Sequence, residues 1–149
     1  MKKSLCTLLL AAITTISVAQ ATDDGQELIN NFFEIYKTKG YEFAFKYTLE
    51  TNKWIPARGD EMNNIILEFK KDVATMGTYL GNEEIRNKKI GSRFRITSYL
   101  VYYDRDPVRF TFELYKNNIG WEISNFVFDF RFDEEAEESI RLTSAAQFR

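Results

Sequence analysis

Asp104 and Asp106 stand close together in the segment Asp104-Arg105-Asp106-Pro107. Neighbouring carboxylates are typical of a site for a hard cation such as Ca²⁺, which takes about six or seven oxygen ligands. The surrounding sequence supplies too few further oxygen ligands for such a site. Asp residues beside a proline are common in turns. We therefore predict a turn here and no metal site.

Arginines recur through the second half of the chain, at Arg93, Arg95, Arg105, Arg109 and Arg131. They could form a face that binds anions. Ion pairs across neighbouring strands, with partners such as Glu113 and Glu122, explain them more economically. The sequence has no glycine-rich loop for phosphate.

The chain contains no histidine, and Cys6 is its single cysteine. Without histidine the protein lacks the usual general base, the Ser-His-Asp triad and the commonest ligand of transition metals. Thiolate nucleophiles and zinc–thiolate sites are also excluded once the segment that holds Cys6 is removed. We predict no cofactor.

Residues 1–21 have the composition of a secretory signal peptide. Lys2 and Lys3 precede an apolar run from Leu5 to Val18, and Ala19-Gln20-Ala21 fits a cleavage site. Cleavage after Ala21 would export the mature chain to the periplasm or out of the cell; an uncleaved N-terminal anchor is the alternative. We expect a single domain over residues 22–132, followed by an acidic tail over 133–149.

The net charge of the full chain is −2, and removal of Lys2 and Lys3 makes it more negative. Nucleic-acid affinity depends on Lys and Arg contacts to phosphates. A mildly acidic domain without a long basic run is therefore a poor candidate for binding nucleic acid. We expect no membrane span in the mature chain.

Three helices are predicted in the first half of the chain. Apolar residues recur at spacings of three and four over 24–37, where Asp24 and Glu27 resemble a capping box, and again over 60–77. Residues 41–51 fit either a helix or a strand, because their aromatic residues alternate. Their length and position favour a helix.

From Thr78 onward the apolar pattern changes to the alternation of strands. We expect a polar strand within 79–91, then strands marked by alternating apolar residues over 94–102 and 108–114, and a last strand over 121–132. Short turns between them indicate an antiparallel meander. For the acidic tail, a frayed end is favoured over a short surface helix through Ile140 and Leu142.

The last two strands carry a recognisable pattern. It consists of Phe112, Leu114, Tyr115, Lys116, Gly120, Trp121, Ile123 and Phe126. Together with three preceding helices, this pattern resembles the nuclear-transport-factor-2-like (cystatin-like) superfamily. The resemblance implies an α+β fold in which three N-terminal helices pack on a curved four-stranded antiparallel sheet, forming a cone.

The resemblance also implies two kinds of function. Enzymes of this superfamily, such as ketosteroid isomerases and polyketide cyclases, often use an Asp or His base inside the cone, with Tyr or Asp as a hydrogen-bond donor; the absence of histidine excludes the His-dependent versions here. Only Asp129 as base and Tyr102 as donor remain available for a lyase or isomerase of this type. Other members are non-catalytic binding or accessory proteins, which is our leading interpretation.

The aromatic residues between 94 and 132 have two interpretations. The favoured one is a filled core, because aromatic side chains dominate core burial and interiors close to high density. The other is a cavity for a small apolar ligand. Its candidate lining residues are Trp54, Tyr102, Phe110, Phe112, Trp121 and Phe128. A sheet face for a protein partner, or a homodimer through the sheet, also remains open.

The phase of the last strand predicts a β-bulge near Ser124 or Asn125. We expect the even-numbered residues of the second and third strands to meet, Leu100 lying near Phe110 or Phe112. A four-residue turn at 117–120 would then set Asn125 and Asp129 against the core. One extra residue places Phe126 near Phe112 and Phe128 near Phe110, and it turns Asp129 away from the helices.

Overall fold

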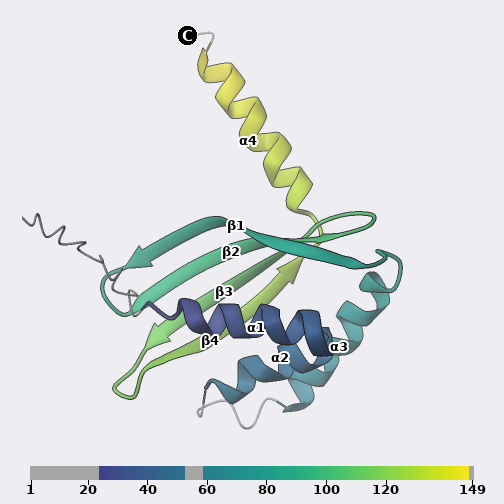
Figure 1. Ribbon diagram of the computed structural model, residues 1–149. Helices are drawn as coiled ribbons and strands as arrows, with labels where there is room; N and C mark the ends of the chain where they lie inside the picture. The colour runs from purple at the N-terminus through teal and green to yellow at the C-terminus, as the bar shows by residue number, and fades with distance from the viewer. Residues whose placement is uncertain (1–23, 53–58, 148–149) are drawn as a thin grey trace, which may run out of the picture.

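The computed structural model describes residues 24–52 and 59–147. Three helices come first, a four-stranded antiparallel sheet follows in the order β1-β2-β3-β4, and a further helix ends the described chain (Figure 1). The elements are α1 (Gln26–Lys39), α2 (Tyr41–Glu50), α3 (Gly59–Val73), β1 (Tyr79–Ile90), β2 (Phe94–Tyr103), β3 (Val108–Lys116), β4 (Trp121–Asp129) and α4 (Phe132–Gln147). The predicted α+β fold is confirmed. The predicted leader, residues 1–21, and Trp54 lie outside the described residues.

Helix α1 begins later than the sequence pattern indicated. Gly25, with a φ of 79°, occupies the position before the helix. It has no side chain, so the helix has no side-chain capping bond at this position. Asp24 instead accepts a hydrogen bond from the backbone N–H of Gln26 at 3.2 Å. A Cβ atom on Gly25 would lie 3.0 Å from the Leu114 side chain and 3.2 Å from Trp121. Only glycine fits this entry to α1, and the predicted capping box does not form.

Helices α1, α2 and α3 cover one face of the sheet (Figure 1). Residues 41–50 form a helix and not a strand, as the sequence favoured, and this helix buries Ala44, Phe45 and Thr48. The buried residues of α1 and α3 follow the predicted spacing of three and four; they are Ile29, Phe32, Phe33, Tyr36, Met62, Ile66 and Phe69.

The prediction of which side chains of β2 face the helices was wrong. Its odd-numbered residues are buried against the helices, and its even-numbered residues lie on the opposite face. Phe110 therefore pairs with Tyr99, and Leu100 pairs with Arg109. The error has a physical cause: both faces of β2 carry apolar residues. The face toward the helices also buries the polar Arg95 and Thr97.

The predicted β-bulge is confirmed at Ser124. The register between β3 and β4 shifts between Glu113 and Leu114, which leaves Ser124 as the extra residue of β4. Beyond the bulge, Phe112 pairs with Phe126 and Phe110 pairs with Phe128. The last strand ends at Asp129, however, and Phe132 already belongs to α4.

Residues 132–147 form a helix, so the favoured frayed tail was wrong. Helix α4 leaves the end of β4 and rises from the sheet on the side opposite α1, α2 and α3 (Figure 1). Its Phe132, Ala136 and Ile140 are spaced four residues apart, as on one face of a helix. The run of acidic residues at its start concealed this spacing, and acidic side chains are favourable in the first turn of a helix.

Candidate functional site

The space between the helices and the sheet is filled by aromatic rings. Phe110 and Phe112 of β3 are fully buried. The ring of Phe112 lies 4.9 Å from that of Phe32, and Phe126 lies 4.8 Å from Phe45, centroid to centroid. These are ordinary distances for packed aromatic pairs. The rings leave no room at these positions for an apolar ligand.

Of the residues proposed to line a cavity, those that the structure describes do not share one. Trp121 and Phe128 pack partly buried against the margin of the core, and Phe110 and Phe112 lie inside it. Tyr102 lies on the opposite face of the sheet, because β2 has the other phase. Its hydroxyl donates a hydrogen bond to Glu83 at 2.9 Å, and this bond raises the pKa of Tyr102.

Asp129 also lies outside the cone. With the bulge in place, it pairs with Arg109 across the outer face of the sheet. Burial raises the pKa of Asp129, but hydrogen bonds from the Arg131 backbone and the Arg109 side chain outweigh burial and lower it overall. A carboxylate with a lowered pKa is a weak base. The structure therefore does not bring Asp129 and Tyr102 together around a pocket between helices and sheet.

Arg109 joins the sheet to α4. Besides Asp129, it contacts the carboxylate of Glu135 and lies over the Phe132 ring, 6.0 Å from its centroid. The hydrogen bond to Glu135 raises the pKa of Arg109, and the same contact lowers the pKa of Glu135. Arg86 of β1 lies 3.8 Å from Glu135. The start of α4 is therefore held to the outer face of the sheet by charge.

Arg95 has partners that the sequence did not suggest. Its side chain is 1% exposed and lies 3.1 Å from Glu84 and 3.4 Å from Asp24, atom to atom. It also donates hydrogen bonds to Gln26 at 2.6 Å and to Asn87 at 3.0 Å. These partners differ from Glu113 and Glu122, the type of partner that the sequence predicted. This cluster fixes the start of α1 onto β1 and β2, which is a structural role.

Tyr36 and Tyr103 form another buried polar contact inside the cone. Their hydroxyl groups hydrogen-bond to each other between α1 and β2. Burial raises the pKa of both phenols, so both stay protonated at neutral pH. Because each hydroxyl already has the other as its partner, the pair serves packing.

The turn at Asp104 behaves as the sequence predicted. Asp104 accepts a hydrogen bond from the backbone N–H of Thr78 at 2.5 Å, which lowers its pKa. A Cβ atom on Gly77 would meet Asp104 at 2.5 Å, so glycine is required beside this contact. Asp106 pairs with Arg105 at 3.0 Å. Over 24–52 and 59–147, no three acidic, histidine or cysteine residues are grouped as metal ligands would be.

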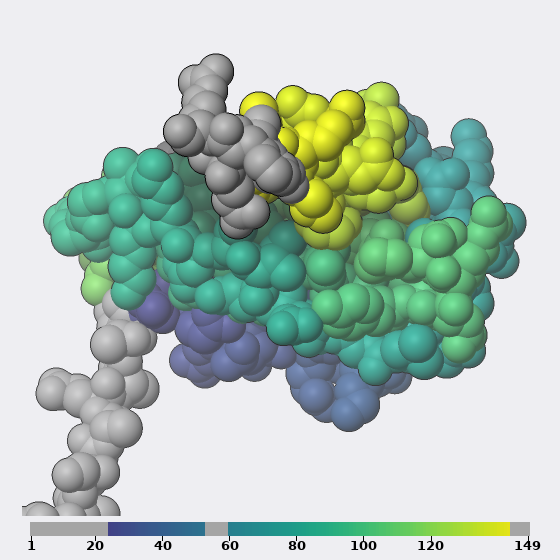
Figure 2. All heavy atoms as spheres, turned by 90° about the horizontal axis from the view of Figure 1, so that it is seen from above, coloured from purple at the N-terminus to yellow at the C-terminus, as the bar shows by residue number. Residues whose placement is uncertain are grey.

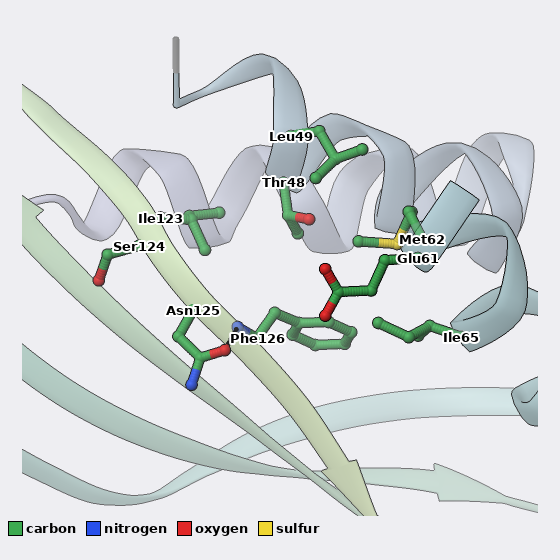
Figure 3. A pocket seen from close by; sticks show the side chains of 9 residues that line it. All are labelled: Thr48, Leu49, Glu61, Met62, Ile65, Ile123, Ser124, Asn125 and Phe126. Carbon is green, nitrogen blue, oxygen red and sulfur yellow. Dashed lines mark hydrogen bonds between the residues drawn. The ribbon is translucent and has the colours of Figure 1, made fainter. Parts of the chain in front are cut away.

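A small pocket opens where α2, α3 and the bulged part of β4 meet (Figure 3). Glu61 points across the Phe126 ring, while the Ser124 hydroxyl points away from both (Figure 3). The volume is about 60 Å³, and a water molecule in the liquid takes about 30 Å³. Asn125 already accepts the backbone N–H of Phe126, and Ser124 donates to the carbonyl of Glu113. This pocket has room for water and not for a substrate.

The face of the sheet opposite α1, α2 and α3 carries many apolar side chains. We call it the outer apolar face and define it by Ile85, Ile90, Phe94, Ile96, Leu100, Tyr102, Tyr115 and Val127. Val127 is 49% exposed and Ile90 is 51% exposed. In the view of Figure 2, α4 stands over part of the molecule and leaves a large part of β1 and β2 in sight.

A groove of about 240 Å³ runs between α4 and this face. Ile85, Arg86 and Ser98 line it from the sheet, and Ala136 and Ile140 line it from the helix. Ile140 remains 67% exposed. The groove and the adjoining outer apolar face are thus apolar surfaces bordered by the charges that anchor α4.

Comparisons of the chain with models of protein families, with curated proteins and with solved structures found no match. Among the helices of the described residues, none is long and apolar enough to cross a membrane.

Proposed function

We propose that this chain is a non-catalytic binding domain, exported to the periplasm or beyond the cell, that holds a protein partner against its outer apolar face. The filled cone is the observation that carries the proposal. Because the protein's own rings occupy the space between helices and sheet, exposed apolar side chains for binding remain on the other face. Large exposed apolar patches commonly mark interaction sites.

The chemistry of α4 indicates what kind of partner fits. This helix contacts the outer face through an acidic side chain, Glu135, and through apolar residues such as Phe132. Farther along the sheet, Ile96 lies between Lys88 of β1 and Glu113 of β3. Apolar groups thus continue past α4, with a basic group on the β1 side. We infer an occupant with apolar and acidic side chains on one side, lying alongside α4.

The edges of the sheet are poorly suited to pairing with another strand, and this favours a partner that binds to the face of the sheet. β1 has register shifts at Leu80 and Ile85 and carries several charged residues, both of which discourage pairing with another strand. At the other edge, the backbone N–H of Ile123 donates to Thr51 at 3.1 Å. The contact with Thr51 occupies part of the β4 edge, and the register shifts interrupt the row of backbone groups along β1.

The lyase or isomerase alternative lacks comparable support. It needs a base in a pocket, and Asp129 is engaged by Arg109 on an open face. Hydrogen bonds from the Arg131 backbone and the Arg109 side chain hold the pKa of Asp129 below its ordinary value, whereas a general base works best with a pKa near the working pH.

Photo-cross-linking at chosen positions tests the proposal in cells that make the protein. A photoreactive amino acid replaces Ile96 on the outer face, Ile140 on α4, or Phe43, which is 58% exposed on α2. We expect Ile96 and Ile140 to capture the same second polypeptide and Phe43 to capture none of it. Equal capture from Phe43, or no capture from Ile96, would contradict the proposal. Capture of a second copy of this chain would replace the proposed partner with a homodimer.

A further inference from the structure

A further cavity lies where the end of α3, the turn between β2 and β3, and the start of α4 meet. Its volume is about 460 Å³, within the range of about 300 to 1,000 Å³ typical of small-molecule sites. Met76, Phe130 and Phe132 form its apolar lining. These residues come from separate segments, so the folded chain is needed to build the cavity.

The aromatic core ends at this cavity. The ring of Phe130 packs 6.0 Å from Phe69 and 5.7 Å from Phe128, centroid to centroid. Phe69 is fully buried, whereas Phe130 and Phe132 are partly exposed. The buried ring network thus ends at Phe130, which lines the cavity together with Phe132.

Charged groups around the cavity are mostly acidic. Asp72, Asp106 and Asp133 line it, with Arg105 as the basic residue among its lining residues. Arg105 is paired with Asp106 at 3.0 Å. The remaining charge is negative, which disfavours anionic ligands and favours cationic ones.

We propose that this cavity binds a small organic cation, with a methylated ammonium group against Phe130 and Phe132 and its charge between the carboxylates. Aromatic faces attract such cations through the ring quadrupole, and recognition of quaternary ammonium groups uses this interaction. The apolar lining supplies contacts for the methyl groups. The inference does not rest on the protein partner proposed above, although Phe132 lines both this cavity and the groove beside α4.

Titration of the purified mature protein with choline, followed by NMR or calorimetry, tests the inference. The neutral isostere 3,3-dimethylbutan-1-ol has the same shape without the charge and serves as the matched ligand. We expect saturable choline binding that is at least about fivefold tighter than binding of the isostere and that weakens in high salt.

Two variants locate the site. Phe130→Leu keeps apolar bulk and removes the π-face, so choline affinity should fall about two- to fivefold. Asp133→Asn should also weaken choline binding without affecting the isostere, and it tests the site even if Phe130→Leu folds poorly. Asp60→Asn, an exposed change on α3, should leave affinity unchanged. Equal affinity for both ligands, no saturation, or binding that survives both site variants would overturn the inference.

Discussion

Arg95 shows how a charged side chain is used for structure in this protein. Its guanidinium group is buried between the start of α1 and strands β1 and β2, with Asp24 and Glu84 as ion-pair partners. Charges removed from water stay favourable only when well paired. The cluster therefore stabilises the fold as a unit, and loss of one member affects the others.

Arg95→Ala should be strongly destabilising. Breaking a buried pair costs about 3 to 5 kcal/mol, and the partial exposure of Glu84 and Asp24 lowers our expectation to about 2 to 4 kcal/mol. Denaturant unfolding measures the loss. Arg141→Ala, a change of an exposed arginine on α4, is the control and should alter stability by less than about 0.5 kcal/mol. A loss below about 1 kcal/mol for Arg95→Ala would contradict a structural role.

Asp24 should make the free energy of unfolding depend on pH in the acidic range. Burial raises its pKa, but the hydrogen bonds from Lys89 and the Gln26 backbone and the charge of Arg95 outweigh burial, so its pKa falls below the ordinary 3.8. A carboxyl with a lowered folded pKa stabilises the fold above its unfolded pKa. That contribution is lost as the pH falls through the folded value.

The matched test compares Asp24→Asn with the unchanged protein across pH. The variant should be less stable near neutral pH, and the difference should close as the pH falls below 3.8. Asp60→Asn, on the exposed side of α3, should show no such trend. A difference that stays constant down to about pH 2 would show that Asp24 acts by packing and not by charge.

Burial of Arg95 also explains why the sequence misled us about β2. Phe94, Ile96, Leu100 and Tyr102 alternate as a buried face would, yet they lie on the outer side. The observed phase places Arg95 among partners such as Asp24 and Gln26, which lie far from it in the chain. No local pattern could have shown them.

At the scale of elements, the bulge in β4 decides which side chains reach the core. Ser124 is the extra residue, and the side chains beyond it exchange faces. Because a shift of one residue moves every later side chain to the other face, the bulge is needed to bury Phe126.

Deletion of Ser124 should therefore remove the bulge without changing the faces. Asn125 would follow Ile123 directly, and Phe126 would still pair with Phe112, so we expect cooperative unfolding and the near-ultraviolet circular dichroism of packed rings to be retained. Ser124→Ala keeps the residue count and should cost only about 1 kcal/mol for the hydrogen bond to Glu113. Loss of cooperative unfolding in the deletion variant would disprove this view of β4.

Among the elements, the bulge was predicted correctly from the sequence, and α4 was not. The bulge followed from a short turn of fixed length and from the alternation of phenylalanines, which are both local features. The sequence favoured a frayed end over helix α4, because the acidic start of the helix resembles a solvated tail. Its contacts through Glu135 with Arg109 and Arg86 depend on the assembled sheet.

At the scale of the whole molecule, the helices and the sheet enclose aromatic rings instead of a binding chamber. The sequence favoured this filled core, but it placed Tyr102 inside the cone, where the structure does not. With the inside occupied, the proposed function rests on the outer apolar face and on the groove beside α4. The predicted helices cover one face of the sheet and leave the other face open for the proposed partner.

The most direct test of the account measures how tightly the cross-linked partner binds when the outer face is changed. Ile96→Lys places a charge in the middle of that face, and Phe43→Lys is the matched change on an exposed helix surface. We expect Ile96→Lys to weaken binding at least about tenfold, equivalent to about 1.4 kcal/mol, with an unchanged unfolding midpoint, and Phe43→Lys to have no effect. Unchanged affinity for Ile96→Lys, or equal losses for both variants, would contradict the claim that the protein works through its outer apolar face.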